Sequence, residues 1–249
     1  MLDHDAFFRP IAHRGLHNAN KGIIENTAPA FEAAIAKGYG IECDLRAAGG
    51  GLPIVFHDET LNRLVIGKGR VSDLKVRDLK ALAYKNSDTR ILTFSDLLDL
   101  AGARVPLLVE IKSEWDPPDK SFLSRVARLA QAYKGPIALM SFDPDVMAAV
   151  RELAPKVARG IVSGSYAGQG WWQKKLPKSR AQDLRDLLLS GPADPQFYAY
   201  QVSALPTAVT RYAREVCGLA LFTWTVRTAK DRALAARWAD AAIFEGFEP

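Results

Sequence analysis

One short stretch, Ile41-Glu42-Cys43-Asp44-Leu45-Arg46, anchors both the fold and the chemistry of this sequence. Side chains alternate between the two faces of a strand, so Glu42, Asp44 and Arg46 share one face. Two carboxylates are costly to bury in an apolar strand unless a cation binds them, and oxygen donors suit a hard divalent cation. Taken alone, the pattern favours a half-exposed strand with two solvated acids. The neighbouring segments change that interpretation.

A second apolar run, residues 52–57, follows after only a few residues. A parallel crossover needs about a dozen residues or more, so this run has to return antiparallel to the first. Gly49-Gly50-Gly51 supplies the turn, because glycine tolerates the positive φ of tight turns. A turn centred between Gly50 and Gly51 pairs Asp44 with His57, which places this histidine beside the carboxylates.

Short apolar strands alternate with helical patterns along the chain, which is typical of parallel β/α architecture. The predicted parallel strands are residues 11–14, 41–45, 107–112, 137–142, 157–162, 197–202, 221–226 and 241–245. Helical spacing is found from Phe94 to Leu100, Phe122 to Tyr133, Leu184 to Leu188 and Val209 to Val216. Eight such strands in 249 residues predict an α/β TIM (β/α)8 barrel. We expect one domain, residues 1–249, with residues 58–92 as a small insertion after strand 2.

The composition is that of an ordinary globular protein, with 48% hydrophobic and 24% charged residues. The net charge of +5 suits an anionic ligand, but the basic residues are scattered, so no nucleic-acid partner is expected. Cys43 and Cys217 lie far apart and are expected to be reduced. The sequence shows neither a leader peptide nor an apolar run of about 18 residues, so we expect a cytoplasmic protein without stable membrane insertion.

Functional residues of a β/α barrel lie at the carboxyl ends of its strands. Here the chemistry-bearing ends are His13-Arg14, Glu42-Cys43-Asp44, His57-Asp58 on the returning hairpin, and Glu110-Ile111-Lys112. Each has an ordinary structural explanation by itself, such as a core histidine or a snorkelling surface lysine. Their convergence on one rim is much harder to explain by structure alone.

These side chains suit the cleavage of a phosphodiester. Glu42, Asp44 and Glu110 would hold Mg²⁺ or Ca²⁺ and leave positions for water and a phosphate oxygen. Arg14 and Lys112 would neutralise the phosphate, the arginine through bidentate hydrogen bonds and the lysine as a point charge.

Two histidines complete the set. His13 and His57 would act as general base and general acid, because an imidazole titrates near working pH. The sequence leaves open which histidine takes which role.

In their order along the chain, these motifs resemble the glycerophosphodiester phosphodiesterase family, a barrel related to the phosphatidylinositol-specific phospholipases C. The matching elements are Ala12-His13-Arg14-Gly15, Glu25-Asn26-Thr27, Ile41-Glu42-Cys43-Asp44, Phe56-His57-Asp58, Leu61-Asn62-Arg63, Val109-Glu110-Ile111-Lys112, Ser141-Phe142 and Thr223-Trp224-Thr225-Val226. Each element is short, but the ordered set runs from residue 12 to residue 226 and is highly specific.

The resemblance implies a metal-dependent hydrolase that converts a glycerophosphodiester to glycerol 3-phosphate and an alcohol. It implies the same metal, acid–base and phosphate residues as above, adds Glu25 as a support behind the site, and makes Trp224 a wall beside the glycerol. Asn26 or Thr27 also suits the N-cap of the following helix. Near the C-terminus the family commonly has Thr-Asp-x-Pro, where this chain reads Phe244-Glu245-Gly246-Phe247-Glu248-Pro249. We therefore expect the rim at the last strand to differ.

Two other functions stay open. A lysophospholipase D-type hydrolase would use the loop from Ser163 to Lys175, in which Trp171-Trp172 would grip an acyl chain or touch a lipid surface. The simpler interpretation of that loop is that its aromatic residues pack over the barrel. The other function is a catalytically silent barrel that binds phosphorylated ligands, which is weakened because no metal or histidine position is lost.

Overall fold

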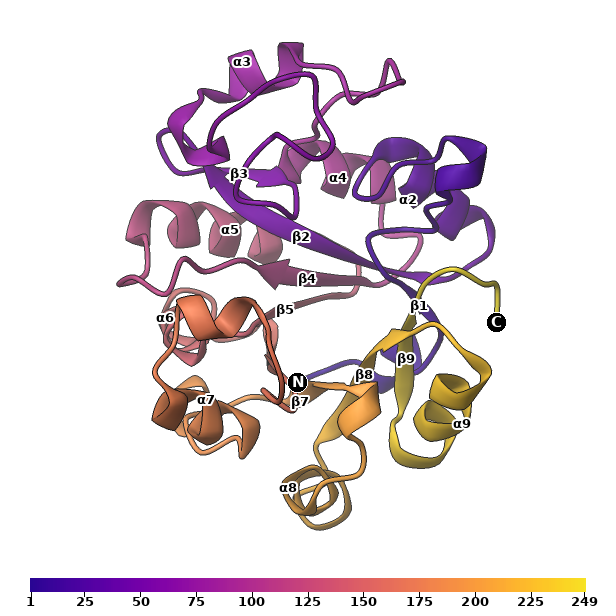
Figure 1. The fold of residues 1–249 in the computed structure, drawn as a ribbon, viewed down its shortest axis with the longest axis vertical. Coiled ribbons are helices and arrows are strands. Elements are labelled where there is room, and N and C mark those ends of the chain that lie inside the picture. Colours follow the sequence, from indigo (N-terminus) through magenta and orange to yellow (C-terminus); the bar gives the residue numbers. More distant parts are fainter.

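The structure, a computed structural model, describes residues 1–249, and its parallel strands close into a barrel (Figure 1). The strands follow one another around the barrel in chain order, and the first pairs with both the second and the last. They are β1 (Ile11–Ala12), β2 (Gly40–Ala48), β4 (Leu107–Ile111), β5 (Ile137–Ser141), β6 (Ala158–Ser163), β7 (Phe197–Gln201), β8 (Ala220–Val226) and β9 (Ala241–Phe244). The predicted TIM barrel is confirmed.

Most of the helices surround the barrel on the outside (Figure 1), whereas α1 (His4–Phe7) packs on the inner layer of the barrel through Phe7. The others are α2 (Ala28–Ala36), α3 (Val76–Ala81), α4 (Phe94–Ala101), α5 (Lys120–Ala132), α6 (Pro144–Leu153), α7 (Lys178–Arg185), α8 (Ala208–Arg211) and α9 (Ala229–Trp238). The predicted helix from Leu184 to Leu188 is wrong at its end: α7 stops at Arg185, because Leu187 has a left-handed φ of 58° and Leu188 is exposed.

Two apolar layers hold the barrel together. The inner layer fills the barrel itself with 14 buried residues, and the ring of Phe7 from α1 packs on Phe222 at 6.3 Å between centroids. The outer layer of 38 buried residues lies between the strands and the helices. Cys43 and Leu45 of β2 belong to this outer layer, so the alternating residues Glu42 and Asp44 point to the inside of the barrel.

The predicted hairpin is confirmed, with a register one residue away from the prediction. β3 (Leu52–Val55) pairs antiparallel with β2, and the backbone N–H of Phe56 donates to the carbonyl of Asp44 at 3.0 Å. Asp44 therefore lies opposite Phe56, not His57. Ala48 pairs with Leu52, so Gly49, Gly50 and Gly51 form a three-residue loop centred on Gly50. Gly50 and Gly51 both adopt positive φ, which glycine tolerates.

The insertion after this hairpin, residues 58–92, contains a 3₁₀ turn at Val71–Asp73 and the short helix α3. Its apolar residues form a separate cluster of nine buried residues together with Ala48, Ile54 and Phe56 from the hairpin. The insertion thus packs on β3 and covers the rim beside β2 (Figure 1). No helix of the chain is long and apolar enough to cross a bilayer.

Candidate active site

Three carboxylates meet inside the C-terminal rim of the barrel. Glu42 and Asp44 extend from β2 and Glu110 extends from β4, where the parallel register sets Asp44 beside Glu110. Their donor oxygens lie within 4.8 Å of one another. All three are buried, with at most 7% of each residue exposed. The cluster predicted from the sequence is therefore brought together.

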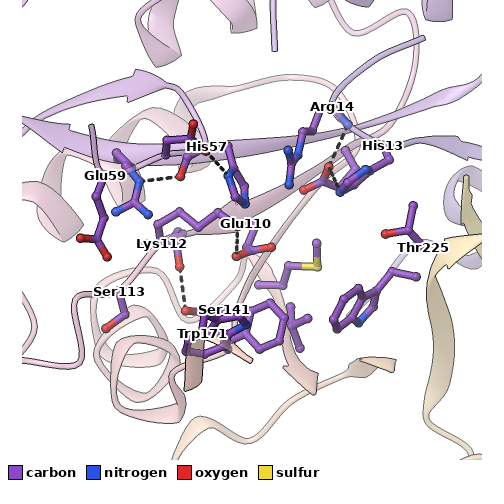
Figure 2. Close-up of a pocket in the computed structure, with 18 of the residues that line it drawn as sticks. His13, Arg14, His57, Glu59, Glu110, Lys112, Ser113, Ser141, Trp171 and Thr225 are labelled. Atoms are coloured by element: carbon purple, nitrogen blue, oxygen red, sulfur yellow. Dashed lines mark hydrogen bonds and ion pairs between the residues drawn. The ribbon is translucent and has the colours of Figure 1, made fainter. Parts of the chain in front are cut away.

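Two cations contact this cluster. Nζ of Lys112 lies 2.8 Å from Oδ1 of Asp44. It also lies 2.5 Å from Oε1 of Glu110 (Figure 2). The backbone N–H of Arg14 donates to Oε2 of Glu42 at 2.9 Å, and its Nε lies 3.2 Å from Oδ2 of Asp44. Both predicted phosphate-binding residues thus lie at the carboxylates.

The charges divide unequally within the cluster. Burial, together with the negative charges of Asp44 and Glu110, raises the pKa of Glu42 well above its usual range. Burial would also raise the pKa of Asp44, but Lys112, His57 and Arg14 outweigh it and hold this pKa well below its usual range. Two cations therefore do not fully compensate three buried acids.

The donor set fits a hard divalent cation. Oδ1 of Asp44 is buried, and Nζ of Lys112 lies 2.8 Å from it. All the donors are carboxylate oxygens, the ligands that Mg²⁺ and Ca²⁺ prefer. A further positive charge would also relieve the acid whose pKa is raised, Glu42. Glu42, Asp44 and Glu110 are thus a candidate metal centre.

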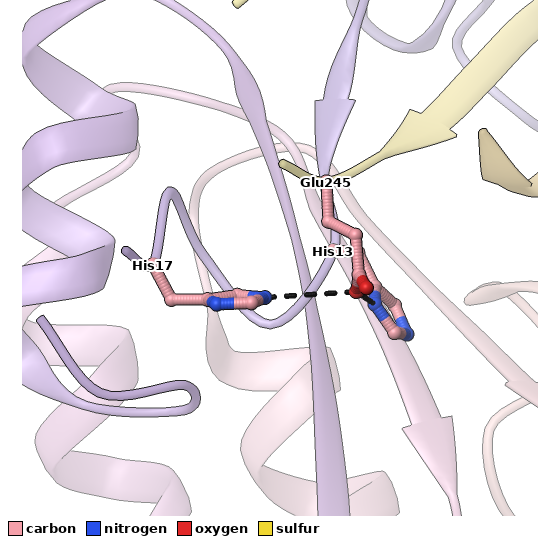
Figure 3. Close-up of side chains that lie close together, drawn as sticks. All are labelled: His13, His17 and Glu245. Atoms are coloured by element: carbon pink, nitrogen blue, oxygen red, sulfur yellow. Dashed lines mark hydrogen bonds and ion pairs between the residues drawn. The ribbon is translucent and has the colours of Figure 1, made fainter. Parts of the chain in front are cut away.

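His13 follows β1, and its Nδ1 is hydrogen-bonded to the carboxylate of Glu245, directly after β9 (Figure 3). The other oxygen of Glu245 accepts a hydrogen bond from Nε of Arg227 at 2.6 Å. Nε2 of His13 lies 3.9 Å from Oε2 of Glu42. Burial, and then the charge of Arg14, lowers the pKa of His13, although its hydrogen bond with Glu245 opposes this. Burial therefore favours the neutral form of this imidazole next to the carboxylate cluster.

His57 has a similar arrangement, built from its own neighbours. Its Nδ1 lies 2.7 Å from Oδ1 of Asp58, and Oδ2 of Asp58 accepts a hydrogen bond from Nε of Arg63 at 2.6 Å. Burial would raise the pKa of Asp58, but hydrogen bonds with His57 and Arg63 hold it well below its usual range. Nε of Arg46 donates to the backbone carbonyl of His57 at 2.6 Å and fixes the end of the hairpin.

Glu25 and Asn26 support the cluster from the loop before α2. Glu25 accepts hydrogen bonds from Arg14 and from Arg63, each at 2.7 Å. Because Arg63 also donates to Asp58, Glu25 links Arg14 to the partner of His57. Nδ2 of Asn26 donates to Oδ2 of Asp44 at 2.7 Å. Asn26 therefore binds a site carboxylate and does not cap α2, whose N-cap position is Thr27. The sequence signal for this contact was its place in Glu25-Asn26-Thr27.

A cavity of about 630 Å³ lies over these groups, and it is lined by Glu42, Glu110, both histidines, Arg14 and Lys112. One wall is a row of four aromatic rings in contact. Ring centroids are 5.3 Å apart for Trp224 and Phe142, 5.6 Å for Phe142 and Trp171, and 5.8 Å for Trp171 and Trp115. Trp172 instead packs on Tyr166, so only one member of the predicted Trp171-Trp172 pair lines the cavity.

Sequence reasoning missed Glu245 and Arg227. Glu245 lies 232 residues from His13, and no local pattern joins the two. The only available signal was topological: in a closed barrel the first and last strands pair, so both residues lie at neighbouring strand ends.

The model of the glycerophosphoryl diester phosphodiesterase family matches residues 13–247. The chain belongs to this family. A protein of Mycobacterium tuberculosis, named as a probable glycerophosphodiester phosphodiesterase 1, is 27% identical over 89% of this chain and 82% of its own length. A glycerophosphodiester phosphodiesterase of Caldanaerobacter subterraneus is 37% identical over 41% of this chain, and glycerophosphodiester phosphodiesterase 1 of mouse is 29% identical over 64%. These two matches span only 44% and 51% of the relatives' own lengths.

Solved structures share the fold of this family member. A phosphodiesterase of Oleispira antarctica, in complex with the product sn-glycerol-3-phosphate, has a TM-score of 0.75 at 20% identity and covers 97% of this chain and 94% of its own. A glycerophosphodiester phosphodiesterase of Thermotoga maritima has a TM-score of 0.71 at 21% identity, with coverage of 96% and 94%. At these identities the likeness establishes the barrel.

Proposed function

We propose that this chain is a metal-dependent phosphodiesterase that hydrolyses glycerophosphodiesters to glycerol 3-phosphate and an alcohol. One observation carries the proposal: two carboxylate-bound histidines and two cations line the same cavity as Glu42 and Glu110, which cluster with Asp44. The family membership supports the same substrate class.

The proposed cation ligands are Glu42, Asp44 and Glu110. Bound there, Mg²⁺ or Ca²⁺ would polarise a phosphate oxygen and offset charge that develops during the reaction. Arg14 and Lys112 add fixed positive charge at the same wall, where the anionic oxygens of the substrate phosphate would lie. Glu25 holds the guanidinium of Arg14 in place through its hydrogen bond at 2.7 Å.

His13 and His57 would move the protons. A carboxylate occupies Nδ1 of each ring, which leaves Nε2 to exchange a proton with the substrate. One histidine accepts the proton of the attacking hydroxyl group, and the other donates a proton to the oxygen of the leaving alcohol. Both steps are needed because, near neutral pH, a neutral hydroxyl group is a weak nucleophile and an unprotonated alkoxide is a poor leaving group.

A lysophospholipase D-type activity is the second candidate, and the aromatic row favours it. Trp224, Phe142, Trp171 and Trp115 form a continuous apolar wall on which a long alkyl or acyl chain would bury surface. Trp171 is 47% exposed at the mouth of the cavity, so a chain leaving the cavity would pass over it.

A substrate panel tests the proposed function. Purified protein with Mg²⁺ or Ca²⁺ would be given glycerophosphocholine, glycerophosphoethanolamine or lysophosphatidylcholine, each with an EDTA control. We expect glycerol 3-phosphate from the first two substrates and no product with EDTA. Turnover of lysophosphatidylcholine alone would favour the second candidate, and no turnover at all would leave a barrel that only binds phosphorylated ligands.

A pair of tryptophan variants separates the two candidates further. Trp171→Ala removes part of the cavity wall, whereas Trp172→Ala alters the same loop outside the cavity and is the matched control. If the aromatic row holds an acyl chain, Trp171→Ala lowers kcat/KM for lysophosphatidylcholine about tenfold and changes that for glycerophosphocholine much less. Equal effects on both substrates would contradict the acyl-chain role.

A further inference from the structure

The carboxylate of Glu245 lies between His13 and His17 at the rim of the barrel (Figure 3). Its Oε2 is hydrogen-bonded to Nδ1 of His13 and lies 3.6 Å from Nε2 of His17. Its Oε1 accepts the hydrogen bond from Arg227. Both carboxylate oxygens therefore face donors, and one of these donors belongs to a proposed catalytic residue.

Backbone pairing fixes Glu245 beside His13. In the parallel register of β1 and β9, Ala12 is the partner of Phe244, so His13 and Glu245 take the next matched positions. The N–H of His13 donates to the carbonyl of Phe244 at 2.9 Å, and the N–H of Glu245 donates to the carbonyl of Val226 at 3.1 Å. The two side chains thus extend from hydrogen-bonded strand ends.

This contact decides which ring nitrogen of His13 carries the proton. An ionised carboxylate only accepts hydrogen bonds, so Nδ1 of His13 has to be the donor. The lone pair of the neutral ring is then at Nε2, the nitrogen that lies 3.9 Å from Glu42. With the opposite tautomer, Nε2 would already carry a proton, so the neutral ring could not accept one there and could not serve as general base, one of the two roles proposed for His13.

We propose that Glu245 is a positioning residue that fixes the tautomer and ring orientation of His13, so that Nε2 faces the reacting phosphodiester. Because His13 is catalytic only under the proposed function, the kinetic part of this inference rests on that function. Arg227 acts from behind: it holds Oε1 of Glu245 and leaves Oε2 for the imidazole.

Glu245→Gln tests the role with little change of shape. Arg227 can only donate, so the carbonyl oxygen of the new glutamine turns toward it and the NH₂ group faces His13. Nδ1 of His13 must then accept, which moves the ring proton to Nε2. We expect kcat on glycerophosphocholine, with Mg²⁺ present, to fall about 100-fold or more with KM changed less than about threefold; the corresponding amide in the serine protease triad costs about 10⁴-fold.

Two further variants serve as controls. Glu248→Gln makes the same chemical change three residues along the chain, at an exposed carboxylate that pairs with Lys37 at 2.8 Å. It should keep kcat within about twofold of the wild-type value, because Glu248 contacts no group of the site. Glu245→Asp keeps the charge on a shorter side chain and should recover part of the lost activity.

¹⁵N NMR of histidine-labelled protein reads the tautomer without any assay of activity. The chain has four histidines, and the signal of His13 is the one lost in His13→Asn. We expect the Nδ1–H tautomer in the wild-type protein and in Glu248→Gln, and the Nε2–H tautomer in Glu245→Gln.

An unchanged His13 tautomer in a folded Glu245→Gln protein would overturn the positioning role, whatever its kcat, and so would wild-type kcat in that variant. If Glu245→Gln does not fold, the same spectra of Glu245→Asp decide, because a lengthened contact has to weaken the preference for Nδ1–H. A wild-type protein that hydrolyses no glycerophosphodiester would refute the proposed function, while the NMR result would still show whether Glu245 sets the tautomer.

Discussion

The two candidate catalytic histidines have the same partners in the same order but obtain them from different parts of the chain. His57 takes its carboxylate from the adjacent residue, Asp58, and the arginine behind it is only five residues further on, at Arg63. His13 takes its carboxylate from Glu245, 232 residues away, across the pairing of β1 with β9. The first set is local to one loop, and the second exists only when the barrel is closed.

The two sets also differ in exposure. The side chain of His13 is 13% exposed and that of His57 is 32% exposed. Burial lowers the pKa of His13, so its neutral form depends on the barrel around it. The contact of His13 therefore depends on the pairing of β1 with β9, whereas that of His57 depends only on its own loop.

The largest expected effect comes from the histidines themselves. His13→Asn and His57→Asn should each lower kcat on glycerophosphocholine by about 10²–10⁴-fold, since general acid and base catalysis each supply about that factor. The double variant should lose little more than the worse single variant, because residues of one catalytic unit act non-additively. Release of glycerol 3-phosphate measures both, and a single variant with wild-type kcat would exclude its histidine from catalysis.

Asp58→Asn compares the local set directly with Glu245→Gln. Asp58 orients His57 through the hydrogen bond at 2.7 Å, but the side chain of His57 is 32% exposed, so water can replace part of this contact. We therefore expect kcat to fall about 10-fold to 100-fold, less than for Glu245→Gln. Steady-state kinetics on both variants in parallel give the ratio. A larger loss for Asp58→Asn would mean that the local set matters more than the remote one.

The arginines behind the carboxylates should have smaller effects. Arg63 is hydrogen-bonded to both Asp58 and Glu25, whereas Arg227 contacts Glu245 and is 54% exposed. Arg63→Gln should lower kcat about tenfold and Arg227→Gln about threefold, because both side chains are about half exposed but Arg63 holds two carboxylates and Arg227 only one. If the order of the two is reversed, the guanidinium behind Glu245 does more than hold its carboxylate.

The smallest effect concerns stability. Removal of the guanidinium in Arg63→Gln should destabilise the fold by about 1 kcal/mol at pH 7. The pKa of Asp58 is depressed in the folded state, so its contribution to stability is present above the unfolded-state pKa of about 3.9 and is lost as the pH falls further. Urea unfolding of the wild type and of Asp58→Asn, which lacks the titrating group, at pH 7 and at pH 3.5 should therefore show the difference in the free energy of unfolding between the two proteins shrinking at the lower pH. A constant difference would contradict this assignment.

Most of the fold followed from local patterns in the sequence. Alternation in Ile41 to Arg46 set Glu42 and Asp44 inside the barrel, and the short link at Gly49-Gly50-Gly51 required the antiparallel hairpin. The register was wrong by one residue, because three consecutive glycines allow several turn geometries and nothing local selects the centre. The helix expected through Leu188 ended early, because apolar spacing continues past Arg185 although the backbone at Leu187 turns left-handed.

The site was predictable where its residues follow strand ends, and not elsewhere. Glu42, Asp44, Glu110 and Lys112 come together because neighbouring parallel strands end at one rim. Asn26 was noticed as a helix cap, yet it binds Asp44, because its φ of 57° turns the side chain away from α2. Glu245 could not be found from spacing, since the contact depends on how the barrel closes. The roles of all these residues in catalysis stay predictions.

A pair of substrates that differ only in the leaving group tests most directly whether two histidines share one reaction. The choline of glycerophosphocholine is a poor leaving group that needs a general acid. The p-nitrophenyl ester of glycerol phosphate instead expels p-nitrophenolate, which leaves without protonation. With Mg²⁺ present, either His13→Asn or His57→Asn should recover most of its lost kcat on the activated ester, and the other should stay impaired on both substrates. Equal losses for both variants on both substrates, or no loss in either, would contradict the division of acid and base between the two histidines.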